Sequence, residues 1–218
     1  VQGAIDEVIW DGSTLSYTII GGNGNGSKAR GICGSGLVAA IASLLDGGLI
    51  EDTGRINDDE DSLPADLRDR LTKIDGQAAI VIVPAAETAD GQPIVLTQKD
   101  IRELQNAKAA IAAGIELLVD RAGLCPQCID KAFIAGGFGN YLDVEHAFRI
   151  GLLPPSLLGR TRAAGNTSGM GAVLCLLDAQ SLVRASEIIS QVEYFELSGD
   201  KRFVDLYVDA MMFPENEP

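Results

Sequence analysis

Three glycine-rich stretches are the parts of this sequence best suited to ligand chemistry. They span residues 21–36, 136–139 and 165–171. Glycine lets backbone N–H groups approach an anion where a strand turns into a helix, so these stretches suit a phosphate or a nucleotide. None is a Walker A loop, because Lys28 follows Ser27 rather than a glycine at the required spacing. None has the GxGxxG pattern with an acidic residue about 20 positions on, and each alone is also typical of a structural turn.

The segment Cys125-Pro126-Gln127-Cys128 has the spacing of half a zinc site or of a redox pair. A zinc site needs two further ligands, and Cys33 and Cys175 are distant and form no matching pair. A thioredoxin-like motif would follow a strand, whereas this one follows a predicted helix. We therefore expect two thiols in a loop or in packing, and neither zinc nor iron bound by this chain.

Lys108 interrupts the apolar side of that predicted helix, between Leu104 and Ile111. It is either a lysine whose stem covers the edge of the core while its amine reaches water, or a cation directed at a ligand in a cleft. The single histidine, His146, excludes a multi-histidine metal site. The acidic run at 58–61 is expected to be a solvated loop, with binding of a basic partner as the alternative.

The elements that position these residues begin with a hairpin. Apolar and polar residues alternate on both sides of Asp11-Gly12, which is a strong signal for a tight turn. A helix is predicted from about Leu37 and ends at Gly47-Gly48, because glycine is favoured just after a helix. Residues 51–77 are polar, with a short helix expected at 65–71.

The clearest element is a long helix after Thr97. Thr97 is a good N-cap, and apolar residues recur at steps of three and four as far as Ala122. Such a helix of roughly 25 residues would be about 37 Å long. Strands are predicted at 79–83, 132–135, 162–164 and 192–197, and further helices at 144–150, 168–177 and 179–190. Strands that lead through glycine turns into helices indicate an α/β layered fold.

Composition limits the possible functions. Apolar residues make up 46% and charged residues 22% of the 218 residues, which is typical of a globular chain. The net charge of −14 argues against a nucleic-acid surface, because phosphate binding needs a positive footprint. No apolar run approaches the ~20 residues that span a bilayer, and no basic-then-apolar leader is present. We expect a soluble, acidic, cytoplasmic α/β protein with no membrane partner.

The order of the motifs resembles the second half of the actin-like ATPase superfamily, which includes sugar kinases and heat-shock chaperones. The resemblance implies a ribonuclease-H-like mixed sheet with flanking helices, and residues 51–122 as an inserted helical subdomain. In that superfamily the strand-Gly-Gly turn is the adenosine motif, and the later helix of small residues connects the two lobes.

Four strings resemble more closely the C-terminal domain of reductive activators of corrinoid-dependent enzymes. They are ARGICGSGL, LTQKDIRELQNAKAAI, AGGFGNYLDVEHAFRIGLLP and VEYFELSGDKRFVDLYVDAMMFP, which start at Ala29, Leu96, Ala135 and Val192. Members carry an N-terminal two-iron ferredoxin domain, a linker and a two-lobed ATPase. They use ATP to drive an electron onto a cobalt(II) corrinoid and so regenerate cobalt(I).

The resemblance implies roles for individual residues. The turn residues expected in or beside the adenosine pocket are Gly136, Gly137, Phe138, Gly139 and Asn140. Gly34 and Gly36 are expected on the ribose or phosphate side, and Lys108 is expected to reach the adenosine. Asn166 and Gly169 are expected in the connecting helix. Neither a catalytic residue nor a metal ligand is assigned.

The chain also departs from the full family pattern. It has no four-cysteine ferredoxin motif, and the first phosphate loop with its metal-binding aspartate is missing. Residues 1–218 are therefore expected to be the C-terminal ATPase lobe, with the N-terminal lobe and the ferredoxin domain absent. The missing half would complete the binding site for ATP and magnesium. The iron–sulfur cluster would lie in the missing N-terminal ferredoxin domain. The chain alone is expected to be inactive, although the longer enzyme is an ATP-dependent activase.

The expected partner is a corrinoid protein or a corrinoid-dependent methyltransferase. Two other functions stay open on the sequence. The same fold could serve as an interaction or homodimerisation module without nucleotide use, or the chain could be half of a small-molecule kinase.

Overall fold

The computed structural model describes residues 1–22, 27–137 and 141–215. The strands are β1 (Ala4–Trp10), β2 (Leu15–Ile19), β3 (Gly31–Ile32), β4 (Leu71–Ile74), β5 (Gln77–Val83), β6 (Ile94–Thr97), β7 (Ala132–Ala135) and β8 (Thr161–Gly165). The helices are α1 (Gly34–Asp46), α2 (Ala65–Arg68), α3 (Gln98–Arg121), α4 (Val144–Arg149), α5 (Thr167–Leu177), α6 (Ala179–Ile189) and α7 (Lys201–Asp209).

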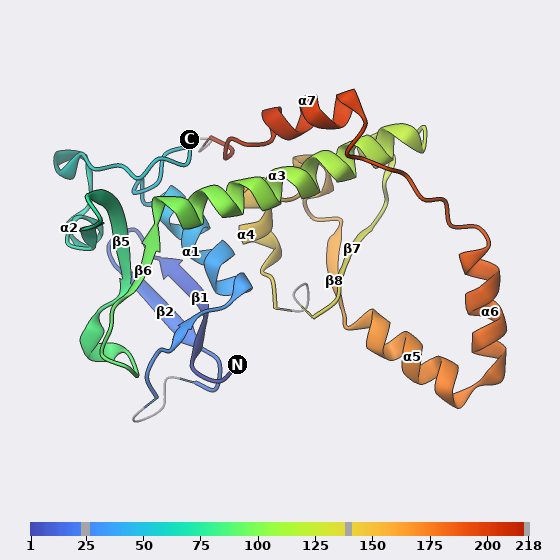
Figure 1. Ribbon diagram of the computed structural model, residues 1–218, viewed down its shortest axis with the longest axis horizontal. Coiled ribbons are helices and arrows are strands. Elements are labelled where there is room, and N and C mark those ends of the chain that lie inside the picture. The colour runs from blue at the N-terminus through green and yellow to red at the C-terminus, as the bar shows by residue number, and fades with distance from the viewer. Residues whose placement is uncertain (23–26, 138–140, 216–218) are drawn as a thin grey trace.

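The strands form three small sheets. The first has the order β2-β1-β3, in which β2 is antiparallel and β3 parallel to β1. The second is an antiparallel β4-β5-β6 sheet, and the third is the parallel pair of β7 and β8. Figure 1 shows helix α1 between β1 and α4, and helix α3 running across the molecule from β6 towards β7. The predicted mixture of parallel and antiparallel strands flanked by helices is confirmed.

One hydrophobic core connects these elements. Its members include Ile5 of β1, Ile41 of α1, Ile80 of β5, Ile101 of α3 and Ile150 after α4, all of which are fully buried. Buried residues of the predicted subdomain at 51–122 therefore pack in the same cluster as the N-terminal hairpin. Burial of aliphatic side chains in one cluster supplies most of the favourable free energy of folding.

Helix α3 is the element that local sequence determines best. Thr97 accepts a hydrogen bond from the Asp100 amide at 3.3 Å, and the Asp100 carboxylate accepts one from the Thr97 amide at 2.9 Å. This reciprocal capping box satisfies two amides that a helix start leaves unpaired. The helix has 24 residues, close to the expected length.

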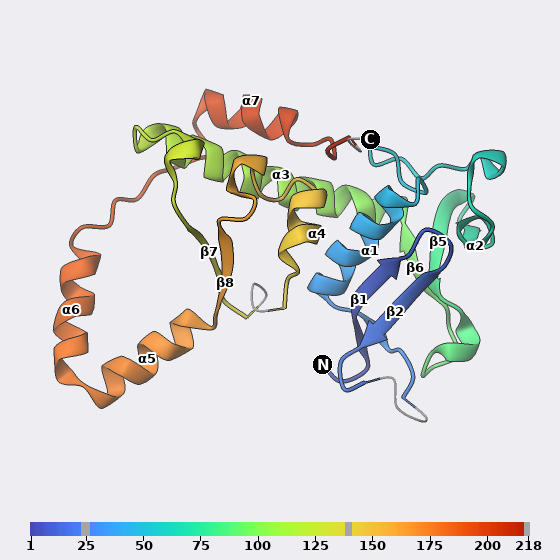
Figure 2. The ribbon, with the colours of Figure 1, turned by 180° about the vertical axis from the view of Figure 1, so that it is seen from behind.

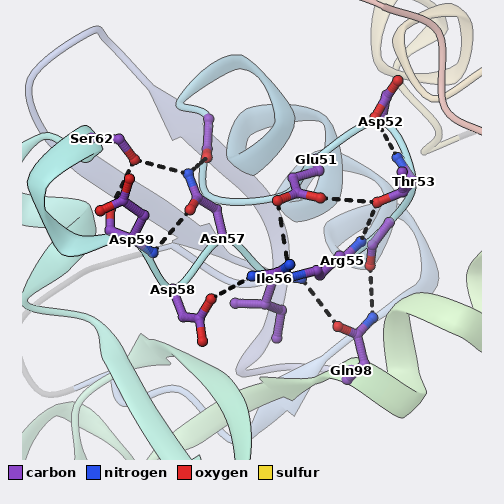
Figure 3. A network of polar contacts seen from close by, with 12 residues as sticks. Glu51, Asp52, Thr53, Arg55, Ile56, Asn57, Asp58, Asp59, Ser62 and Gln98 are labelled. Carbon is purple, nitrogen blue, oxygen red and sulfur yellow. Dashed lines mark hydrogen bonds and ion pairs between the residues drawn. The ribbon is translucent and has the colours of Figure 1, made fainter.

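The segment before β4 is organised by polar contacts that Figure 3 shows from close by. Gln98, the first residue of α3, accepts a hydrogen bond from the Ile56 amide at 3.1 Å and donates one to the Gly54 carbonyl at 2.7 Å. Arg55 donates to Asp58 at 2.7 Å and holds the pKa of that carboxyl below its usual range. The acidic run thus begins in an ordered turn that is tied to α3.

The C-terminal part differs from the rest of the molecule. In Figure 1 helices α5 and α6 stand away from the body, and an extended segment leads from α6 back to α7, which lies beside α3. Figure 2 shows the same arrangement from behind. We define residues 166–200 as the arm. Neither α5 nor α6 buries a residue against the rest of the described chain.

Three sequence predictions are corrected. Residues 192–197 are not a strand, because extended chain becomes a strand only where another strand pairs with it. The short helix expected at 65–71 ends at Arg68, and Leu71 opens strand β4 instead. Cys125 and Cys128 are not free thiols, since they form a disulfide; a sequence spacing cannot report the oxidation state of a cysteine pair.

Candidate functional site

Two of the predicted glycine turns meet at the carboxyl ends of strands β7 and β8. The Gly136 amide donates to the Gly165 carbonyl at 2.9 Å. Both glycines have positive φ values, +104° and +69° respectively, which residues with a side chain rarely adopt. Gly137 follows Gly136 directly, whereas Phe138, Gly139 and Asn140 lie outside the described residues. Parallel strands place these turns at one edge of the sheet, as the strand-turn-helix pattern predicts.

Asn166 and Gly169 form the start of helix α5. The Asn166 side chain accepts a hydrogen bond from the Gly169 amide at 3.0 Å and so caps the helix. A Cβ atom at position 169 would lie 2.8 Å from Asn166 Nδ2, so a larger residue there would shift the Asn166 amide. Asn166 is the N-cap of α5 and Gly169 lies in its first turn, next to Gly165 and so to the Gly136 turn; that this helix connects two lobes stays a prediction.

Gly34 and Gly36 lie in the first turn of α1, where the helix passes close to β1. The Ile5 carbonyl accepts a hydrogen bond from the Cys33 amide at 3.0 Å. A Cβ atom on Gly36 would lie 2.2 Å from that carbonyl oxygen, a distance that real structures essentially never show. The glycine at position 36 is thus explained by packing, and its predicted role beside a ribose or phosphate stays a prediction.

A cavity of about 280 Å³ lies between the start of α1 and the segment before α4. Ser35, which stands between Gly34 and Gly36, forms part of its wall, and so does Tyr141. The other lining residues are Asp6, Glu7, Ala39, Leu142, Asp143 and His146. The cavity therefore brings together the start of α1 and residues 141–146, which are about a hundred positions apart in the sequence.

The polar groups of this cavity are mainly acceptors. Asp6 accepts from the Thr18 hydroxyl at 2.8 Å, and Asp143 caps α4 by accepting from the Glu145 and His146 amides. His146 Nδ1 is buried and has no hydrogen-bond partner among the described residues. Carboxylates repel phosphate but accept hydrogen bonds from hydroxyl and amino groups. This wall suits the ribose or base of a nucleotide better than its phosphates.

The described residues do not form a metal centre. Within residues 1–22, 27–137 and 141–215, no group of three or more His, Cys, Asp or Glu side chains could hold a metal ion. In the same part of the chain, no helix is both long and apolar enough to cross a membrane.

Lys108 lies in a different place from the glycine turns. Its side chain is buried, its amine donates a hydrogen bond to the Met212 carbonyl, and it lies 5.0 Å from the centre of the Phe213 ring. Burial lowers the pKa of this amine from 10.5 to about 8. The interpretation of an amine that reaches water is wrong, and contact of Lys108 with adenosine stays a prediction.

Residues 211–214 form a strap over Lys108 that sequence reasoning missed. Gln105 donates to the Met211 carbonyl at 2.9 Å, and the Phe213 amide donates to the Asp52 carbonyl at 2.8 Å. Arg149 donates to the Pro214 carbonyl at 3.0 Å. The partners are at least 65 residues apart in the sequence, and the acceptors are backbone carbonyls, which carry no sequence signal. Likewise, no motif marks Asp6, Glu7 or Tyr141.

Comparisons with known proteins identify the family of this chain. The family model for the C-terminal domain of RACo, the ASKHA domain, matches residues 1–218. The corrinoid activation enzyme RamQ of Eubacterium limosum is 38% identical over 216 residues, which cover 98% of this chain and 36% of RamQ. The [Co(II) methylated amine-specific corrinoid protein] reductase of Methanosarcina barkeri is 26% identical over 190 residues, covering 86% of this chain and 30% of that protein.

A solved structure is also similar. A protein named reductive activator for corrinoid, iron-sulfur protein matches with a TM-score of 0.86 and 33% identity, over 100% of this chain and 33% of its own. The chain thus spans about a third of the length of the relatives that it matches. The predicted actin-like ATPase fold is confirmed, and the chain belongs to the family of RACo C-terminal ASKHA domains.

Proposed function

We propose that this chain is the C-terminal nucleotide-binding lobe of an ATP-dependent activator that reduces the cobalt(II) corrinoid of a partner protein. One observation supports this most directly. The cavity of about 280 Å³ is lined by Ser35, which lies between Gly34 and Gly36, and by Tyr141, four positions after Gly137; the family resemblance puts the nucleoside beside these two glycine motifs.

In this proposal the chain supplies the adenosine side of the site. Gly137 has no atom within 4 Å of the position where a Cβ would stand, so the backbone there is open to a ligand. Phosphate and magnesium contacts come from the other lobe, because the cavity wall carries Asp6, Glu7 and Asp143 and no lysine or arginine. ATP supplies the free energy for an uphill electron transfer, and the iron–sulfur cluster that carries the electron lies outside this chain.

The arm supports a second part of the proposal, that α5 connects the two lobes. Leu174, Leu176 and Leu177 of α5 are 55%, 85% and 78% exposed. Apolar side chains gathered on one helix in this way mark a contact surface. In the longer protein the other lobe covers the apolar side chains of α5. Residues 51–122 form an appended unit of the same lobe, and the protein is cytoplasmic.

The test uses the full-length activator. Titration with magnesium-ATP is compared for the parent, for Gly137→Ala, and for Gly199→Ala as a matched control, because Gly199 also has open space around its Cβ position but lies in the arm. Gly137→Ala should weaken ATP binding at least about tenfold, equivalent to about 1.4 kcal/mol, and Gly199→Ala should leave it unchanged. Absorbance of the partner corrinoid then reports formation of cobalt(I).

Each result decides between functions. ATP binding without cobalt(I) formation would favour an unrelated ATPase, and a phosphorylated small molecule would favour a kinase. If the full-length protein binds no nucleotide, the result would favour the function of an interaction module. The 218-residue chain alone should hydrolyse no ATP and show no binding below about millimolar concentration, because lost phosphate contacts are worth about 1.5–3 kcal/mol each. Micromolar binding would contradict the assignment of phosphate contacts to the other lobe.

A further inference from the structure

The disulfide between Cys125 and Cys128 lies at the surface, between the end of α3 and the start of β7. Both cysteines are exposed. The residues between them, Pro126 and Gln127, form a single turn of 3₁₀ helix with Cys128. A soluble thiol can therefore reach the sulfur atoms without opening the core.

This bond contributes little to the stability of the fold. The cysteines are three positions apart, and a ring this short removes little conformational entropy from the unfolded chain. The nearby core is held by buried aliphatic residues that do not include either cysteine. A metal role is also unsupported, since the described residues provide no third ligand near the pair. Neither a structural nor a metal-binding purpose accounts for the pair.

Arg160 places a positive charge beside the turn. Its Nη1 donates to the carbonyls of Gln127 and Ile129, at 2.6 and 3.0 Å, and these two residues flank Cys128. A neighbouring guanidinium stabilises a cysteine thiolate, which is the leaving group when a disulfide is attacked. The Arg160 carbonyl also accepts from the Ala132 amide at 3.1 Å. One residue thus joins the disulfide turn to the first rung of the β7–β8 pair.

We propose that Cys125 and Cys128 form a reversible thiol–disulfide exchange site whose reductant is a protein dithiol. A thiolate of the donor attacks one sulfur, a mixed disulfide forms, and the Cys125–Cys128 bond breaks with release of a thiolate that takes up a proton. The second donor thiol then attacks the mixed disulfide and frees the other cysteine. In total, two electrons and two protons pass to the pair, and the donor leaves as a disulfide.

The redox state of the pair changes the entry to β7. In the oxidised form the disulfide and Arg160 both hold the turn, whereas in the reduced form only Arg160 does. Because β7 leads into Gly136, reduction loosens the segment before one of the glycine turns. This inference stands on the cysteine pair and Arg160, so it is independent of the proposed ATP-driven function.

The experiment exposes the folded, full-length protein to buffers with graded ratios of reduced to oxidised dithiothreitol, followed by alkylation and peptide-resolved mass spectrometry. Cys125 and Cys128 should change from protected to alkylated together, as one two-electron couple, whereas alkylation of Cys33 and Cys175 should not depend on the ratio. Alkylation of Cys125 and Cys128 at every ratio would overturn the proposal. So would a disulfide that persists until circular dichroism shows unfolding.

Two arginine variants test the mechanism of exchange. Arg160→Gln should slow reduction by dithiothreitol about tenfold. Arg162→Gln is the matched control, because Arg162 also donates to two backbone carbonyls, those of Gly159 and Thr161, but not to the disulfide turn. Equal rates for the two variants would overturn the role of Arg160. Hydrogen exchange of residues 124–136 should increase on reduction in the parent and stay constant in Cys128→Ser.

Discussion

Helices α1 and α5 have similar amino-acid compositions, but α1 is buried and α5 is exposed. Both follow a glycine-containing turn, and both consist mainly of small and aliphatic residues. Helix α1 buries ten of its 13 residues, whereas α5 buries none of its 11 within the described chain. The difference shows that an apolar helix sequence specifies the need for a partner but not where in the polypeptide that partner lies.

The packing of α1 explains its burial. The Ser43 hydroxyl donates to the Val8 carbonyl at 2.8 Å, and Gly36 allows the helix to touch the Ile5 backbone. Helix α5 has a well-formed N-cap at Asn166 but contacts chiefly α6. Helix α5 thus has a side-chain N-cap but few tertiary contacts, whereas α1 has no side-chain N-cap and is fixed by its packing against β1.

The largest difference is expected when an aliphatic side chain is truncated in each helix. Ile41→Ala in α1 should lower the free energy of unfolding by about 2–5 kcal/mol, because it leaves a cavity in the core. Leu176→Ala in α5 should change it by less than about 0.5 kcal/mol, because that side chain is 85% exposed. Urea unfolding of the 218-residue chain, followed by circular dichroism, measures both. Equal losses would show that the arm packs on the body in solution.

A pair of glycine substitutions extends the comparison to the backbone. Gly36→Ala should lower the free energy of unfolding by about 1–3 kcal/mol, because the new Cβ atom would lie 2.2 Å from the Ile5 carbonyl oxygen. A Cβ atom at position 171 in α5 would have no atom within 4 Å. Gly171→Ala should therefore raise the free energy of unfolding by about 0.5–1 kcal/mol through helix propensity. The same urea titration provides the measurement. A stable Gly36→Ala chain would contradict the close approach of α1 and β1.

The burial of the Lys108 amine predicts that the stability of the body depends on pH. Burial lowers the pKa of this amine to about 8 in the folded chain, against 10.5 for the ordinary group. Above pH 8 the unfolded state therefore retains a proton that the folded state has lost. The free energy of unfolding should rise with pH between about 8 and 10, by at most about 1.4 kcal/mol per unit.

Lys108→Met provides the control for this prediction, because it should remove the rise with pH. Burial and a hydrogen bond to Glu87 raise the pKa of Tyr17 to about 12. Its ionisation therefore makes the free energy of unfolding fall with rising pH, but only above pH 10. A parent protein that loses stability steadily from pH 8 to 10 would contradict the assignment to Lys108.

The smallest change in stability is expected from a substitution at the point where the chain returns from the arm to the body. Arg202 of α7 pairs with Asp120 of α3 at 2.9 Å, and both side chains are largely exposed. Surface ion pairs of this kind contribute little and are screened by salt. Arg202→Ala should leave the urea midpoint unchanged within error, at both low and high salt. A clear shift of the midpoint would show that this pair anchors the arm.

Sequence information predicted elements that local interactions determine. The capping box of Thr97 and Asp100 marks the start of α3 without reference to any distant residue. Strands β4 and β6 were missed because their pairing with β5 depends on residues elsewhere in the chain. Val192 to Leu197 has the composition of a strand but no partner strand.

The candidate site was predictable only in part. The turn at Gly136 and the cap at Asn166 follow from glycine and asparagine chemistry, and the structure brings them together. The cavity wall formed by Glu7, Tyr141 and His146 combines residues from distant segments, so that no short motif could identify it. Lys108 was noticed because it interrupts an apolar pattern, but its acceptor, a backbone carbonyl of residue 212, has no recognisable sequence.

The strap at 211–214 has a consequence for how the domain folds during synthesis. Domains fold as their chains leave the ribosome, N-terminal segments first. Helix α3 emerges with the amine of Lys108 uncovered, and about a hundred further residues must be translated before Met212 and Phe213 arrive to cover it. Until then the nascent domain carries a hydrated cation at the edge of its core. Completion of this core therefore waits for residues 211–214, and a ribosome that stalls before residue 211 holds a domain that has not closed.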